Sequence, residues 1–113
     1  MRKETPMLRL AAATLLALSL GAVAAGEPEF NLAIEGHKFT PDRIEVPAGK
    51  KVKLLVENKD ATPEEFESPA LKVEKVIPGK SKATIYVGPL KAGEYTFIGE
   101  YNEKTAHGVV VAK

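Results

Sequence analysis

The feature that most constrains this sequence is a series of short apolar–polar alternations, each ended by glycine or proline. In 30–34 and 83–87, for example, every second residue is apolar, the pattern of a strand with one buried face. No stretch beyond residue 25 has the i, i+3, i+4, i+7 spacing of an amphipathic helix over three turns. The segments expected to be extended are 30–34, 44–46, 52–56, 72–77, 83–87, 95–98 and 108–112. About six to eight short strands with such turns predict an all-β, Greek-key β-sandwich.

Residues 1–25 have the features of a secretory signal peptide. Three basic residues precede an apolar run, 10–23, and small residues follow at the expected cleavage point. The run of about 14 residues is short for a bilayer, which needs ~20. We therefore expect cleavage after Ala24 or Ala25, a periplasmic location, and no membrane span in the remaining domain, 26–113.

Composition excludes several functional classes. The chain has no cysteine, which removes disulfides, thiolate metal ligands and thiol catalysis. Beyond residue 25 there are 13 basic and 14 acidic side chains, a net charge of −1, and there is no tryptophan. This balance argues against nucleic acid as a partner. Two histidines, the absence of nucleotide-binding and H-E-x-x-H motifs, and a domain too small for a deep cleft predict that the protein is not an enzyme.

A local motif supports the β-sandwich. Leu90, Gly93 and Tyr95 have the L-x-x-G-x-Y spacing of a tyrosine corner, in which the tyrosine hydroxyl bonds to upstream backbone and pins the arch between two strands. The other interpretation is an ordinary turn followed by a half-buried tyrosine.

Several motifs together resemble the cupredoxin family. They are F-x-P-x-x-I-x-V-P-A-G at 39–49, V-x-L-x-V-x-N-x-D at 52–60, and G-P-L-x-x-G-x-Y-x-F at 88–97. The stretches 60–68 and 99–102 are similar to the cupredoxin-like proteins found with bacterial iron permeases and to the N-terminal domain of ferrous-iron transport components. The resemblance covers nearly the whole chain beyond the leader and implies the cupredoxin fold.

The resemblance also shows where copper ligands would stand. A blue-copper site uses two histidines, a cysteine and a weak axial methionine. The corresponding positions here are Glu64, Gly99, Asn102 and His107. All four depart from the family pattern, so the resemblance implies a cupredoxin-like protein without type 1 copper.

Oxygen donors remain at that end of the molecule. We predict Glu64, Glu65, Glu67, Glu100 and His107 as candidate metal ligands, because carboxylates with one imidazole suit iron, manganese, calcium or oxidised copper. Strand alternation divides the set: if Phe66 points inward, Glu64 shares its face and Glu65 and Glu67 point outward. A solvated acidic rim is the other interpretation.

Two functions are compatible with these residues. The resemblance implies a periplasmic accessory of an iron-uptake system, which binds iron or copper and passes the ion to a membrane iron permease or another periplasmic uptake component. The alternative is a metal-free protein-binding module on a cupredoxin scaffold, suggested by the loss of all four copper-ligand positions.

Overall fold

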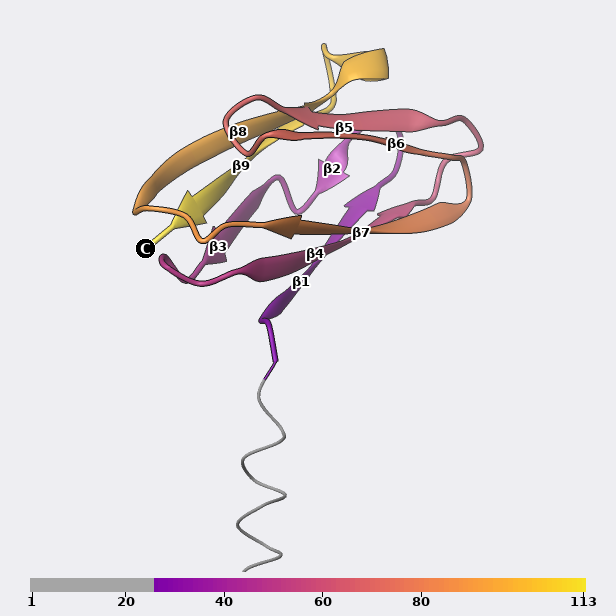
Figure 1. The fold of residues 1–113 in the computed structure, drawn as a ribbon. Helices are drawn as coiled ribbons and strands as arrows, with labels where there is room; N and C mark the ends of the chain where they lie inside the picture. Colours follow the sequence, from indigo (N-terminus) through magenta and orange to yellow (C-terminus); the bar gives the residue numbers. More distant parts are fainter. Residues whose placement is uncertain (1–25) are drawn as a thin grey trace, which may run out of the picture.

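The computed structural model describes residues 26–113, and the predicted leader, residues 1–25, lies outside the described residues. Within residues 26–113, nine strands and one 3-10 turn form two layers, with β5, β6, β8 and β9 in the upper layer of Figure 1 and β1, β4 and β7 in the lower. The elements are β1 (Glu29–Ile34), β2 (Phe39–Thr40), β3 (Arg43–Val46), β4 (Val52–Asn58), β5 (Glu64–Ser68), β6 (Val73–Ile77), β7 (Ser81–Val87), β8 (Gly93–Gly99), η1 (Glu100–Asn102) and β9 (His107–Ala112).

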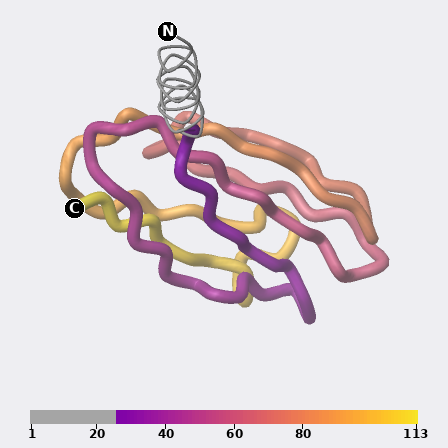
Figure 2. The backbone as a smooth tube through the Cα atoms, turned by 90° about the horizontal axis from the view of Figure 1, so that it is seen from below, coloured from indigo at the N-terminus to yellow at the C-terminus, as the bar shows by residue number. Residues whose placement is uncertain are grey.

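The strands form two sheets. The first has the order β2-β1-β4-β7 and the second the order β3-β9-β8-β5-β6. The pairs β1–β4 and β3–β9 are parallel and the others are antiparallel. Figure 2 traces the strands along the length of the molecule. Consecutive strands repeatedly change sheet, which confirms the predicted all-β sandwich.

The core lies between the two sheets. Alternate residues of β4 are buried, as the period-2 pattern predicts. Three phenylalanines pack together beneath one end of the sandwich: the ring centroids of Phe66 and Phe97 are 4.8 Å apart, and those of Phe39 and Phe97 are 4.9 Å apart. Such aromatic pairs stabilise a core beyond their buried area. Phe66 belongs to β5 and Phe97 to β8, so this cluster supports the strand that contains Glu64, Glu65 and Glu67 and the strand that precedes Glu100.

Two strands fall outside the segments expected from sequence. β2 has only two residues, and β5 has glutamate at 64, 65 and 67, so neither shows a clear apolar alternation. The central position of β5, between β6 and β8, comes from tertiary pairing. The tyrosine corner is confirmed, because the Tyr95 hydroxyl donates to the Lys91 carbonyl at 2.8 Å. Within residues 26–113, no helix has the length and apolar character needed to cross a bilayer.

Candidate functional site

The end of the sandwich where β5 begins also contains the turn between β8 and β9. Phe66 of β5 is in register with Gly99, the last residue of β8, and η1 follows immediately. The turn closes on itself: the Gly99 amide donates to the Ala106 carbonyl at 2.8 Å, and the Ala106 amide donates to the Asn102 carbonyl at 2.8 Å. The turn therefore holds η1 against the start of β5.

Glu64 is the centre of this region. Its side chain points inward beside Phe66 and the residue is only 1% exposed. Oε1 accepts hydrogen bonds from the backbone amides of Tyr101 and Glu65, both at 2.9 Å. Oε2 accepts one from Asn102 Nδ2 at 2.8 Å. Three donors thus satisfy a buried carboxylate, which otherwise would be costly to remove from water.

Gly99 leaves the space that this carboxylate uses. A Cβ at position 99 would lie 2.6 Å from Glu64 Cδ and 2.7 Å from Ala106 Cβ. Ala106 is fully buried against Gly99, whereas His107 is exposed and points to the outer face of β9. Three of the four positions that correspond to copper ligands, Glu64, Gly99 and Asn102, therefore pack together with Ala106 and close the copper position, whereas the fourth, His107, points away. A type 1 copper ion does not fit these residues, because they offer neither a thiolate nor an imidazole.

Hydrogen bonds also join the neighbouring loops. Thr105 Oγ1 donates to the His37 carbonyl at 2.6 Å, and the Asp60 carboxylate accepts the amides of His37 and Gly36 at 3.0 and 2.9 Å. These amides, the His37 amide most, lower the pKa of Asp60. Polar contacts thereby connect the loop ends of both sheets.

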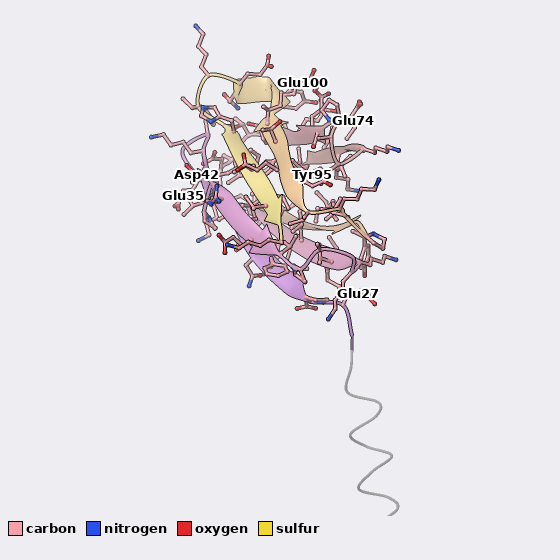
Figure 3. All side chains as sticks on the ribbon, turned by 90° about the vertical axis from the view of Figure 1, so that its left-hand side faces the viewer. Glu27, Glu35, Asp42, Glu74, Tyr95 and Glu100 are labelled. Carbon is pink, nitrogen blue, oxygen red and sulfur yellow. The ribbon has the colours of Figure 1, made fainter. Side chains whose placement is uncertain are left out.

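A second group of carboxylates lies on the outer side of β5. One oxygen each from Glu65, Glu67 and Glu100 lies within 4.8 Å of the others, and Glu65 is only 8% exposed. Glu74 is the cross-strand neighbour of Glu67. Figure 3 shows Glu74 and Glu100 toward the same end of the molecule. We call Glu65, Glu67 and Glu100 the acidic cluster.

Contact with Glu100 and burial raise the pKa values of two glutamates in the acidic cluster. A hydrogen bond with Glu100, burial, and the charges of Glu100, Glu74 and Glu67 raise the pKa of Glu65 to about 7. Burial and the nearby Glu100 raise the pKa of Glu67 as well. Every group that perturbs Glu65 favours its protonated form, so an added cation would relieve repulsion in this cluster.

The five predicted ligands do not form a single site in the structure. It brings Glu65, Glu67 and Glu100 together on the outer face, while Glu64 is buried on the opposite side of β5. His107 shares the outer face but is separated from β5 by its cross-strand partner Ile98. The sequence analysis did not predict that Ala106 packs against Gly99. A buried Ala106 would have predicted, by strand alternation, that the side chain of His107 points outward.

The raised pKa of Glu65 predicts how stability depends on pH. Its ordinary value is 4.5, so as pH rises the unfolded chain loses this proton before the folded chain does. The contribution of Glu65 is therefore most favourable below pH 4.5 and is lost as pH rises to about 7. Glu65→Gln should have a higher Tm than the wild type at pH 8, with little difference at pH 4.5, in buffer containing a chelator. An exposed control, Glu94→Gln, should show no such pH-dependent gain, and an equal gain in both variants would contradict the interpretation.

The two stacked sheets and the closed copper position define a cupredoxin-like protein that lacks the residues of a type 1 copper centre. The chain belongs to the cupredoxin-like domain family, whose model matches residues 8–112. It is 39% identical over 83 residues to an uncharacterized protein of Rickettsia prowazekii (strain Madrid E), a match spanning 74% of this chain and 66%, just under two thirds, of that protein.

Solved structures agree on the fold. Auracyanin A, a "blue" copper protein of Chloroflexus aurantiacus, superposes with a TM-score of 0.64 at 17% identity, over 78% of this chain and 100% of that one. The metal-binding domain of the Cu(I)-exporting P-type ATPase of Streptococcus pneumoniae D39, solved with Cu(I), gives a TM-score of 0.64 at 14% identity, over 75% and 84%. A copper-binding protein in its apo form gives 0.69 at 22% identity, over 79% and 90%.

Proposed function

We propose that the protein binds a hard metal ion at the acidic cluster and acts as a metal-binding accessory of an iron-uptake system. The observation that carries the proposal is the convergence of three carboxylate oxygens, from Glu65, Glu67 and Glu100, within 4.8 Å of one another, with Glu65 only 8% exposed. Among residues 26–113, the charged neighbours that shift its pKa are all carboxylates: Glu100, Glu74 and Glu67. A buried carboxylate in such surroundings is stabilised by a cation.

The donor set indicates the class of ion. Carboxylate oxygens prefer hard cations, so iron is favoured, and oxidised copper is also compatible. The cluster holds a proton near neutral pH, and an ion that binds there must displace it. Glu100 is the first residue of η1 and directly follows β8, so the turn that Glu64 holds through its hydrogen bond with Tyr101 positions one of the three ligands.

The similarity of 60–68 and 99–102 to cupredoxin-like proteins found with bacterial iron permeases supports a place in iron uptake. Both stretches contribute to the acidic cluster, since Glu65 and Glu67 lie in the first and Glu100 in the second. We infer a periplasmic protein, exported by the segment 1–25, that presents the ion to a membrane permease or another uptake component.

Metal titration tests this function. We expect calorimetry at pH 7.5 to detect binding of Fe2+ (without oxygen), Fe3+ (as its citrate complex) or Cu2+ with a Kd below about 1 mM, a binding free energy better than about −4 kcal/mol. Replacing Glu65 and Glu67 together by glutamine should weaken that binding at least about ten-fold, because two of three oxygen ligands lose their charge.

The matched control is the double variant Glu45→Gln, Glu94→Gln, which removes two exposed carboxylates from the same sheet. It should bind the ion as the wild type does. If no ion binds below about 1 mM, or if the control loses as much affinity as the cluster variant, the acidic cluster is not a metal site.

One observation favours the alternative, a metal-free protein-binding module. The copper position is filled by a fully hydrogen-bonded side chain, Glu64, so the scaffold keeps its loops in place without any ion. The metal titration of the wild-type protein distinguishes the two functions, because only the metal-free module predicts no binding of any of the three ions.

A further inference from the structure

Apolar side chains are open to solvent on the outer face of the five-stranded sheet. Between β8 and β9 this face has a hollow of about 360 Å3, and its outward-pointing residues are Thr96, Ile98, His107 and Val109. Ile98 and Val109 are only half-buried, and Val76 on the edge strand β6 is 46% exposed. The face therefore offers two separate apolar places, the hollow and Val76.

The strand register places the acidic cluster between these two apolar places. Ile98 is the cross-strand neighbour of Glu67, and Val76 is the cross-strand neighbour of Glu65. Neighbouring strands lie about 4.8 Å apart and successive residues about 3.3 Å apart, so the hollow is about 7 Å from Glu67, and Val76 is about 8 Å from Glu67 on the other side. A line across β8, β5 and β6 thus meets an apolar, a negative and a second apolar place.

The carboxylates in the middle of this line have no cationic partner. Three ion pairs are present among residues 26–113, and none includes Glu65, Glu67, Glu74 or Glu100. The charges that raise the pKa values of Glu65 and Glu67 are all carboxylates. Lys72, in the turn between β5 and β6, lies beside Glu67 and Glu74 but forms no ion pair with them. With Lys72 included, this part of the face has a formal charge of −3, whereas residues 26–113 together carry −1.

We propose that this face docks an extended segment of a partner protein in which a lysine or arginine stands between two apolar residues, each two positions away. Side chains two residues apart on an extended chain point the same way and lie about 7 Å apart, which matches both steps of the line. The cationic group supplies the charge that the carboxylates lack, and the apolar residues cover the hollow and Val76. An acidic segment would add to the repulsion and is excluded by its charge.

The test uses the purified protein and blocked peptides, in buffer containing a chelator. TLTKTLT carries its lysine and both leucines on one side of an extended chain, whereas TLKTTLT, of identical composition, carries its lysine on the other side. Titration of 15N-labelled protein with TLTKTLT should shift the amide signals of Ile98 and Val76. TLKTTLT should bind at least about three-fold more weakly, since its lysine points away from the carboxylates, and TLTETLT should bind more weakly still.

A charge reversal tests the central contact. Glu67→Lys should weaken TLTKTLT binding at least about five-fold and should make TLTETLT the better ligand. Val76→Ser, at an exposed position, tests the apolar contact and should also weaken TLTKTLT binding. The matched control is Glu57→Lys, an exposed glutamate of β4 on the other sheet, which should bind TLTKTLT as the wild type does.

Three outcomes would overturn the proposal. The first is equal binding of TLTKTLT and TLKTTLT, which would mean unspecific charge attraction. The second is a set of shifted signals confined to the four-stranded sheet. The third is no shift with any peptide, including the case in which the protein instead self-associates in sedimentation velocity. The docking does not require a metal ion, and the chelator removes any, so a failed metal titration leaves the peptide result unchanged and a failed peptide titration leaves the metal result unchanged.

Discussion

Replacing Glu64 by alanine is expected to lower the free energy of unfolding by about 3 to 5 kcal/mol. The substitution removes the acceptor of three hydrogen bonds and leaves the Tyr101 amide and the Asn102 side chain without their partner. A domain of this size has a total stability of only about 4 to 13 kcal/mol, so the loss is a large fraction of it. Urea denaturation followed by circular dichroism measures the change.

Glu64→Gln separates hydrogen bonding from burial. The amide oxygen still accepts hydrogen bonds, but its NH2 group faces a donor, so we expect a smaller loss, about 1 to 3 kcal/mol. Glu94→Ala, an exposed residue of β8, is the control and should change stability by less than about 0.5 kcal/mol. Equal stability of Glu64→Ala and Glu94→Ala would show that Glu64 does not hold the loops together. Because Tyr101 and Asn102 lie in the same turn as Glu100, Glu64→Ala should also weaken metal binding at the acidic cluster.

Gly99→Ala is expected to destabilise the protein by about 2 to 3 kcal/mol through overpacking. Its new methyl group would lie 2.6 Å from Glu64 Cδ and 2.7 Å from Ala106 Cβ, distances that require the surrounding residues to move. Thermal denaturation monitored by circular dichroism gives the effect.

A second substitution tests the cause. Ala106→Gly removes one of the two close contacts, so its cost should be smaller in the Gly99→Ala background than in the wild type. Gly26→Ala is the matched control, since a Cβ there has no neighbour within 4 Å. Additive effects of the two substitutions would show that position 99 does not contact Ala106.

The acidic cluster and the closed copper position show which side-chain directions strand alternation predicts and which contacts it does not. Once Phe66 is inward, alternation puts Glu64 inside and Glu65 and Glu67 outside, and the structure has this arrangement. Alternation alone did not indicate that Glu100 would approach Glu65, because that contact depends on the path of η1 after β8. It also did not place His107, whose direction is set by the buried Ala106 before it.

The sequence by itself determined the all-β sandwich, most of its strands, the tyrosine corner and the absence of a thiolate copper site. Those properties are local: they depend on period-2 burial, on glycine and proline at turns, and on which residue types are present. Only the tertiary structure decided that β5 is a central strand, that Glu64 closes the copper position, and that three glutamates from β5 and η1 meet. Each of these depends on residues more than 30 positions apart, such as Glu64 and Asn102, coming together, and pairing over such distances is decided by the packing of the whole sandwich.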